Sequence, residues 1–148
     1  NLELERLALA AMSLGIARRS IEVMNRYAQE RVAFGHPLNH YGQIQADIAD
    51  SYAEYAAGKA YVYNTAAALD LTRAGNRVDS DGVKLFCARM AKNVADRAVQ
   101  TLGGYGYVGE YQVERLWRDA KLLEIGGGTN GAHQKNMTRD MTRWERLP

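Results

Sequence analysis

The sequence predicts an all-α protein folded as an up-and-down helical bundle. Apolar residues recur at spacings of three and four over three long segments, and no segment is a strand candidate. Proline occurs only 2 times in 148 residues, while alanine, the best helix former, is abundant. Long amphipathic helices with short connections bury their apolar stripes against one another, so we expect a bundle with the shorter helices packed alongside.

The first predicted helix opens the chain and runs to about Arg31. A single stripe supports it: Leu4, Leu7, Ala11, Leu14, Ala17, Ile21, Met24 and Ala28. Residues 33–42, "AFGHPLNHYG", carry the glycine, proline and asparagine of a loop. A second stripe then extends from Ile44 to Leu69, and "TRAGNRVDSD", with Gly75 and Asn76, predicts a stop and a new cap.

The second half of the chain predicts one more long helix and two short ones. The third stripe runs from Val83 to Leu102 and ends at Gly103 and Gly104. A short helix from about Gln112 to Leu123 follows the loop "GGYGYVGEY", and a last helix begins near Thr129 or Asn130. This makes five helices, without an internal repeat.

Length and composition describe one globular domain, residues 1–148, large enough to bury roughly 70% of its unfolded surface. The net charge is +2 with acids and bases interspersed, which argues against nucleic acid or an anionic membrane as a partner. No apolar run reaches the roughly 20 residues of a membrane span. The single cysteine, Cys87, lies within a helical pattern and is expected to be a core thiol. The chain opens inside a periodic pattern, as a piece of a longer protein would.

Three consecutive glycines, Gly126–Gly128, interrupt the chain after the short helix. Each costs roughly 1 kcal/mol of helix stability relative to alanine. One explanation is a tight turn before a new helix N-terminus. The other is that a ligand or another chain approaches the backbone where side chains would block it. Glycine-rich helix ends can also receive phosphates, but each of these stretches alone is a weak signal and favours ordinary capping.

Four motifs in order, "ERVAFG", "QTLGGYGY", "RDAK" and "EIGGGTN", resemble the carboxy-terminal helical domain of the acyl-CoA dehydrogenases over essentially the whole chain. The resemblance implies a homotetrameric flavoprotein with FAD, an acyl-CoA substrate and electron-transfer flavoprotein as acceptor. The amino-terminal helical domain and the central β-domain of that family are absent from this chain. We therefore expect the 148-residue chain alone to be inactive.

The resemblance also implies which residues contact FAD. Those matching the adenosine and pyrophosphate end, held largely by a neighbouring subunit, are Arg31, Phe34, Gln100, Gly103 and Gly104. Thr129 matches a threonine that faces the flavin nucleotide. An arginine fork and close-lying backbone N–H groups suit phosphate oxygens. Without the resemblance, Arg31 is better explained as a solvated residue at a helix C-terminus.

Most family members read Glu-Ile-Tyr-Glu-Gly-Thr at the triplet, where the second glutamate is the catalytic base, whereas this chain has Gly126 and Gly127. Members that act on isovaleryl-CoA or long chains place the base on the first helix instead, and "LELERL" matches them with Glu5. Glu5 is therefore the predicted base that removes the α-proton. Arg6 matches an arginine near the CoA nucleotide, and the small residues 126 and 127 leave room for a branched acyl chain.

The remaining polar residues carry weaker signals. His36, His40 and His133 lack an acidic or cysteine partner at metal-ligand spacing, so we expect surface histidines and no metal site. The tryptophans and tyrosines are expected to be core and interface anchors. Gly131 and Ala132 depart from the family pattern, which usually has an acidic or amide residue and then Ile or Val.

The sequence therefore predicts an FAD-dependent acyl-CoA dehydrogenase domain for a short branched substrate such as isovaleryl-CoA. The alternative is a non-catalytic helical module kept for assembly, which Gly131 and the absent domains favour and Glu5 opposes. A bacterial protein of this kind would be cytoplasmic, and a eukaryotic one would reside in the mitochondrial matrix.

Overall fold

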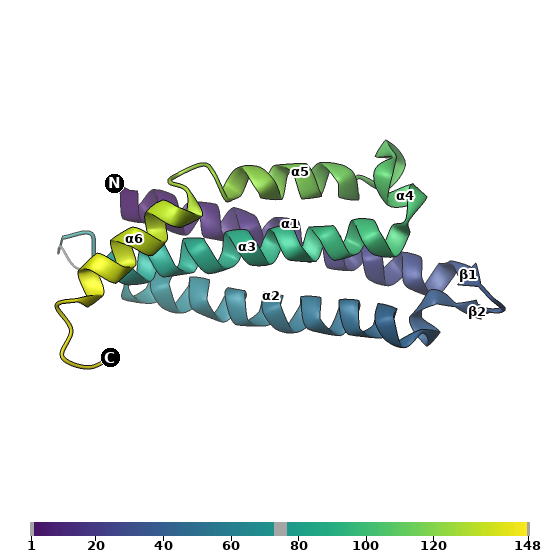
Figure 1. Ribbon diagram of the computed structural model, residues 1–148, viewed down its shortest axis with the longest axis horizontal. Coiled ribbons are helices and arrows are strands. Elements are labelled where there is room, and N and C mark those ends of the chain that lie inside the picture. Colours follow the sequence, from purple (N-terminus) through teal and green to yellow (C-terminus); the bar gives the residue numbers. More distant parts are fainter. Residues whose placement is uncertain (1, 73–76, 148) are drawn as a thin grey trace.

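A computed structural model describes residues 2–72 and 77–147 and confirms the predicted all-α bundle. Three long helices run side by side (Figure 1): α1 (Leu2–Glu30), α2 (Gly42–Ala68) and α3 (Arg77–Leu102). Two shorter helices, α5 (Val113–Leu123) and α6 (Asn130–Met141), follow. The predicted helices thus form close to the expected boundaries. The predicted stop at Gly75 and Asn76 lies outside the described residues.

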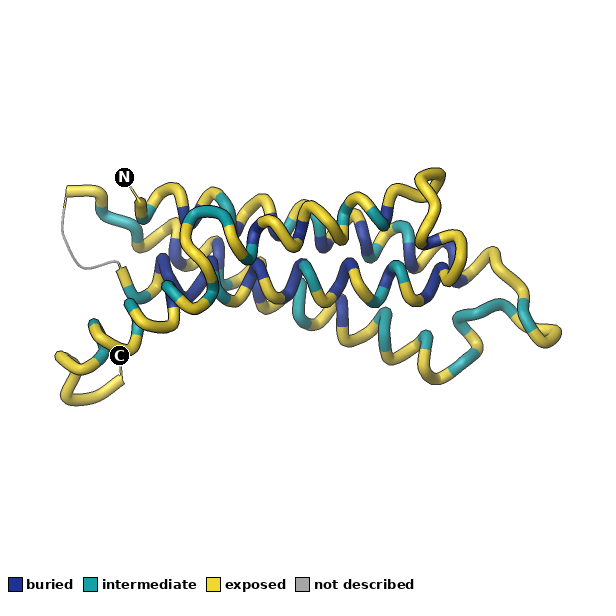
Figure 2. The backbone as a smooth tube through the Cα atoms, turned by 45° about the horizontal axis from the view of Figure 1, so that its top comes forward, coloured by how far each residue is buried: buried dark blue, intermediate teal, exposed yellow. Residues whose placement is uncertain are grey.

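Helix α3 is the centre of the bundle because it is buried by α1, α2, α5 and α6 together. Small side chains of α1 and α3 belong to one hydrophobic cluster, among them Ala10 and Ala17 of α1 and Ala91 and Ala95 of α3, all 0% exposed. Small residues allow the two helix axes to approach closely. Figure 2 shows the buried residues concentrated along the middle of the long helices, while the hairpin end and the C-terminal end are mostly exposed.

Helix α2 is the least buried of the long helices. Four of its residues are buried, namely Ser51, Gly58, Val62 and Thr65. At Gly58, a β-carbon would lie 3.2 to 3.4 Å from Met90, Phe86 and Cys87 of α3, so the two helices are closely packed there. Cys87 is 0% exposed, and burial raises the pKa of its thiol to about 12. The expected core thiol is confirmed.

The expectation of no strand is wrong for the segment between α1 and α2. Strands β1 (Val32–Ala33) and β2 (His36–Pro37) pair antiparallel, with Val32 opposite Pro37 and Ala33 opposite His36. The turn between them places Phe34 (φ 50) and Gly35 (φ 85) in the left-handed region. A 3₁₀ turn, η1 (Leu38–His40), leads into α2. Strands of two residues are too short to show a sequence period.

The predicted loop after α3 also contains more structure than expected. A one-turn helix, α4 (Gly104–Tyr107), and a 3₁₀ turn, η2 (Gly109–Tyr111), bring the α-helices in the described residues to six. At Gly106 the backbone lies against Val99, and a β-carbon would overlap the Val99 carbonyl oxygen. This helix was not predicted because glycine has a low helix propensity. Here, however, the close packing against Val99 requires glycine at residue 106.

Aromatic residues are less buried than the sequence suggested. Of the nine tyrosines, all of them in the described residues, only Tyr27 is buried, and it contacts Tyr105 and Tyr111. Trp117 and Trp144 are 39% and 37% exposed, so neither is a core anchor. The indole N–H of Trp117 donates to Asp96 at 2.8 Å. Within the described ranges, no helix combines the length and apolar character needed to cross a membrane.

Candidate functional site

The glycine triplet forms a closed turn between α5 and α6, and we call residues 124–129 the glycine turn. It begins with the Gly126 N–H donating to the Leu122 carbonyl at 2.8 Å, and ends with the Asn130 N–H donating to the Glu124 carbonyl at 3.1 Å. Gly127 (φ 64) and Gly128 (φ 100) adopt left-handed conformations that side chains disfavour. The Thr129 hydroxyl then caps α6 by accepting from the Ala132 N–H at 3.2 Å.

Helix α1 of the same chain also lies against the turn, whereas the second explanation of the triplet, the approach of a ligand or another chain, stays a prediction. A β-carbon on Gly127 would overlap Cδ1 of Leu9 and lie 3.6 Å from Oε1 of Glu5. The structure therefore brings Glu5 and Gly127 together, 122 residues apart in the chain. Glu5 itself is exposed in this domain, and Gly126 and Gly127 are half-buried. The predicted base and two predicted substrate-binding positions thus share one surface.

A cluster of buried polar side chains packs against the glycine turn. This cluster was not predicted from the sequence. Nδ1 of His133 is 2.5 Å from Oδ1 of Asp81, and Nε of Arg6 is 3.1 Å from the same oxygen. The ammonium of Lys84 donates to the Gly128 carbonyl at 2.7 Å. Asp81 and Lys84 are 0% exposed and His133 is 1% exposed. The expectation that His133 is a surface residue is therefore wrong, because α6 packs its first turn against α3.

The environment of Lys84 opposes its charge. Burial lowers the pKa of its ammonium group, and the positive charge of Arg6 adds to that effect, whereas the carboxylates of Glu124 and Asp81 act in the opposite direction. Lys84 lies on α3, Arg6 on α1 and Glu124 at the C-terminus of α5. Together with His133 of α6, the cluster therefore joins four helices at the turn. Asp81 was interpreted from the sequence only as part of a helix start.

Arg6 occupies an unexpected place. Its predicted contact with a CoA nucleotide stays a prediction, but its side chain is only 9% exposed and directed toward Asp81. In this structure Arg6 therefore ties α1 to α3 instead of presenting its charge at the surface. Its neighbour Glu5 is exposed.

A second group of predicted residues gathers at the opposite end of the bundle. A hollow of about 590 Å³ is lined by Arg31, Gly103 and Gly104, together with Tyr27, Leu38, Thr101, Leu102, Tyr105, Val108 and Glu110. The guanidinium of Arg31 lies 6.0 Å from the centre of the Tyr105 ring. A β-carbon on Gly103 or Gly104 would meet nothing within 4 Å, so both backbones are open to an approaching group.

Two predicted cofactor residues lie beside this hollow without lining it. Phe34 is 96% exposed at the tip of the hairpin, where its ring covers no part of this chain. Gln100 is exposed on the last turn of α3, just before Gly103.

The two groups are far apart. Helix α1 has 29 residues and so spans roughly 43 Å at 1.5 Å per residue. The connection from α5 to α6, which is the glycine turn, lies near the N-terminus of α1, whereas β1 follows its C-terminus (Figure 1). Thr129 precedes α6 in that connection, and Arg31 directly follows α1. The predicted residues therefore do not form one site within this chain.

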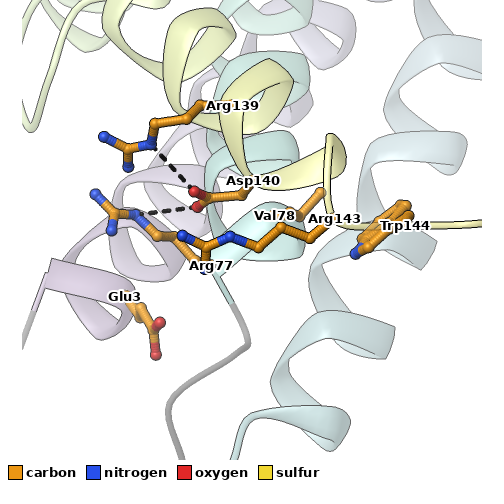
Figure 3. A pocket seen from close by; sticks show the side chains of 7 residues that line it. All are labelled: Glu3, Arg77, Val78, Arg139, Asp140, Arg143 and Trp144. Atoms are coloured by element: carbon orange, nitrogen blue, oxygen red, sulfur yellow. Dashed lines mark hydrogen bonds and ion pairs between the residues drawn. The ribbon is translucent and has the colours of Figure 1, made fainter.

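A second hollow, of about 600 Å³, lies near the N-terminus and contains none of the predicted residues (Figure 3). Asp140 holds two of its three arginines, with Arg77 Nε at 3.4 Å and Arg139 Nε at 3.2 Å. Glu3, Val78, Arg143 and Trp144 complete the lining. In residues 2–72 and 77–147, no group of three His, Cys, Asp or Glu side chains is placed to hold a metal ion.

Comparison with known proteins places this geometry in context. The family model described as acyl-CoA dehydrogenase, C-terminal domain, matches residues 1–142. The mitochondrial isovaleryl-CoA dehydrogenase of Oryza sativa is 40% identical over 145 residues, which are 98% of this chain and 35% of the relative. The cyclohexane-1-carbonyl-CoA dehydrogenase of Geobacter metallireducens is 36% identical over 97% of this chain and 37% of its own length.

Solved structures agree with the sequence comparison. Butyryl-CoA dehydrogenase from Megasphaera elsdenii superposes with a TM-score of 0.91 at 34% identity, covering 96% of this chain and 37% of that one. A structure titled as the electron transferring flavoprotein of Acidaminococcus fermentans gives a TM-score of 0.91 at 31% identity, covering 97% and 37%. The chain spans about a third of the length of the relatives it matches.

Proposed function

The chain belongs to the acyl-CoA dehydrogenase family, as its carboxy-terminal domain, and from this premise we propose that it serves the α,β-dehydrogenation of an acyl-CoA thioester with Glu5 as the base. In this reaction the Glu5 carboxylate takes the α-proton of the acyl group. FAD, when bound, accepts the hydride that leaves the β-carbon. The two lost hydrogens leave a double bond conjugated with the thioester.

The observation that carries the proposal is the approach of Glu5 to Gly127. The resemblance noted from the sequence puts the base of most family members at the position of Gly127. Here Oε1 of Glu5 lies 3.6 Å from the place where a side chain on residue 127 would begin. A carboxylate from α1 therefore reaches the region that a carboxylate from the turn would occupy. General base catalysis depends on the position of the carboxylate and not on the helix that carries it.

The hollow at the other end fits the phosphate-bearing part of FAD. Among the described residues, Arg31 has no ion-pair partner, so its guanidinium is available to phosphate oxygens. Gly103 and Gly104 leave open space over the backbone, and the buried Thr101 hydroxyl has no hydrogen-bond partner among these residues. We propose that Arg31, Phe34, Gln100, Gly103 and Gly104 hold this end of the cofactor.

The separation of the two sites supports an oligomer. Thr129 lies near Glu5, whereas Arg31, 26 residues after Glu5, lies roughly 39 Å away along α1. One subunit would then place Thr129 beside one flavin and Arg31 beside the flavin of a neighbouring subunit. This arrangement is part of the proposal and agrees with the tetramer that the family resemblance implies.

We propose a short, branched acyl group as the substrate. Relatives of similar identity are named for isovaleryl-CoA, cyclohexane-1-carbonyl-CoA and 2-methylacyl-CoA. Glycine at positions 126 and 127 places no side chain of its own against a branch at the β-carbon, although Leu9 occupies the place of a β-carbon on residue 127. Electron-transfer flavoprotein is the proposed acceptor of the electrons, as the resemblance implies.

The test is the anaerobic addition of acyl-CoA to the flavin-loaded enzyme that contains this domain. Isovaleryl-CoA should bleach the oxidised flavin absorption, and faster than butyryl-CoA or cyclohexane-1-carbonyl-CoA does. Bleaching by another of the three in preference would retain the reaction and correct the substrate. No bleaching with any acyl-CoA would favour a non-catalytic assembly module instead.

A further inference from the structure

Side chains that the proposed reaction does not use contact the glycine turn and hold it in place, and several of them are charged. Gly127 faces Glu5 and Leu9 on α1, while the next residue, Gly128, faces the buried cluster. The Gly128 carbonyl accepts from Lys84 at 2.7 Å. A β-carbon on Gly128 would lie 3.1 Å from both Cε1 and Nε2 of His133, so the imidazole packs directly against this backbone.

The His133 ring is itself fixed by Asp81. Nδ1 of His133 lies 2.5 Å from Oδ1 of Asp81, at hydrogen-bonding distance. The same oxygen pairs with Nε of Arg6, the residue after Glu5. The chain of contacts thus runs from the turn through His133 and Asp81 to the segment of α1 that carries Glu5.

Burying ionisable side chains costs free energy, which indicates that these residues have a specific role. Four ionisable side chains, Arg6, Asp81, Lys84 and His133, are at least nine-tenths buried. Nε2 of His133 and Oδ2 of Asp81 have no hydrogen-bond partner among the described residues. Apolar residues of similar size often stabilise a core as well or better. A buried polar network does, however, fix one arrangement of the elements that it joins.

We infer that Asp81, Lys84 and His133 are positioning residues that fix the glycine turn relative to Glu5, and so set the space available to the acyl group. The inference rests on the proposed function, because it concerns the same site. A turn displaced toward α1 would narrow the gap between Gly127 and Glu5. A turn displaced away from α1 would hold the acyl group less tightly. Both displacements alter the alignment of the α-carbon with the carboxylate, and a 1 Å error can cost about a hundredfold in rate.

The test compares His133→Gln, Asp81→Asn and Lys84→Met with the control Arg97→Gln. Arg97 pairs with Glu54 at 2.8 and 3.0 Å between α3 and α2, about four turns along α3 from Asp81. The control thus breaks an interhelical ion pair of α3 far from the turn. Lys84→Met keeps a long unbranched side chain, one atom shorter, without its charge, and serves if either of the other variants fails to fold.

The first readout is the ratio of kcat/KM for isovaleryl-CoA to that for butyryl-CoA in the flavin-loaded enzyme. This ratio does not depend on the fraction of folded protein. We expect the three cluster variants to lose about tenfold in kcat and to change the ratio at least about threefold. Arg97→Gln should leave the ratio unchanged. A constant ratio in the cluster variants would mean that the cluster is only structural and would overturn the inference.

The second readout is amide hydrogen exchange of residues 124–132, which needs no turnover. The cluster variants should accelerate exchange there at least about tenfold more than Arg97→Gln does. Equal exchange would overturn the inference even if the enzyme is active. Conversely, the flavin of the wild-type enzyme could fail to bleach with every acyl-CoA while exchange still accelerates selectively in the cluster variants. That result would refute the proposed function, although the cluster would still be shown to hold the turn.

Discussion

Glu5 and Gly127 face each other across the junction of α1 with the glycine turn, with Oε1 of Glu5 3.6 Å from the place of a β-carbon on residue 127. Leu9, one helical turn after Glu5, fills the rest of this space. Residue 127, which has no side chain, and residue 5, which carries a carboxylate, therefore lie on one surface. The first two predictions concern this pair.

Glu5→Gln should abolish most of the turnover while FAD and substrate still bind. Glutamine is nearly isosteric with glutamate but cannot take up the α-proton. General base catalysis contributes about 10² to 10⁴ in rate, so we expect kcat to fall at least a hundredfold with little change in KM. Stopped-flow measurement of flavin reduction checks this. Glu3→Gln, two residues earlier in α1, is the matched control and should react at the wild-type rate.

Moving the carboxylate to the turn should restore part of that rate. In the Glu5→Gln background, Gly127→Glu places a carboxylate in the same region, but its β-carbon overlaps Leu9 and its backbone is left-handed. We therefore expect rescue to require Leu9→Ala as well. The triple variant should regain about tenfold or more in kcat, and more with butyryl-CoA than with isovaleryl-CoA, because the new side chain crowds a branch. Equal activity of the double and triple variants would show that Leu9 is no obstacle.

Arg31→Ala should weaken FAD retention without altering the fold. The guanidinium is exposed after the end of α1 and has no ion-pair partner in the described residues. A charge-assisted hydrogen bond contributes roughly 1.5 to 3 kcal/mol, so FAD affinity should fall at least about tenfold. The flavin-to-protein ratio after dialysis measures this, with circular dichroism as the check on helix content. An unchanged ratio would remove Arg31 from the cofactor site.

Gly106→Ala should destabilise the protein because the added methyl group meets backbone and not a movable side chain. Its β-carbon would overlap the Val99 carbonyl oxygen and lie 2.9 Å from the Val99 Cα. Overpacking of this kind costs about 1 to 3 kcal/mol in the free energy of unfolding. Gly15→Ala, in the middle of α1 with nothing within 4 Å, is the control and should stabilise by about 0.5 to 1 kcal/mol. Urea unfolding compares the two variants.

Cys87 should make the wild-type protein lose stability at alkaline pH. Burial raises the pKa of the folded thiol to about 12 from 9.0, so the unfolded state releases its proton first. The stability that this protonated thiol contributes to the folded state is fully present below pH 9 and is lost as the pH rises from 9 toward 12. Relative to Cys87→Ala, the free energy of unfolding should drop by about 2 kcal/mol between pH 7 and 10.5. Urea unfolding at both pH values tests this, and a constant difference would contradict it.

The long helices could be predicted because their burial follows the sequence period. Stripes such as Val83 to Leu102 carry the core of α3, and Thr129 has the residue type and position of a helix cap. The hairpin at Val32–Pro37 was missed because two-residue strands have no period, and its left-handed Phe34 is not a residue that typically marks such a turn. Local sequence thus revealed the frame of the bundle but not its irregular connections.

The candidate site divides in the same way. Glu5 and Gly127 were paired through the family resemblance, since no spacing rule relates residues 122 positions apart. The Asp81–His133 contact joins α3 to a polar helix whose only buried residue is His133. A single histidine on such a helix shows no periodic signal, and Asp81 sits in a stretch typical of a helix start. The burial of both follows from tertiary packing of α6 on α3.

The overlap between Leu9 and a side chain at residue 127 also restricts the order in which related sequences could exchange one base for the other. A glutamate gained at residue 127 while Leu9 is still large has no space, and beside an intact Glu5 it adds a repelling charge. Trimming Leu9 first opens that space while Glu5 continues to serve. Chains in this lineage that carry a small residue at position 9 together with Glu5 and Gly127 would therefore be the intermediates from which the relocated base can arise.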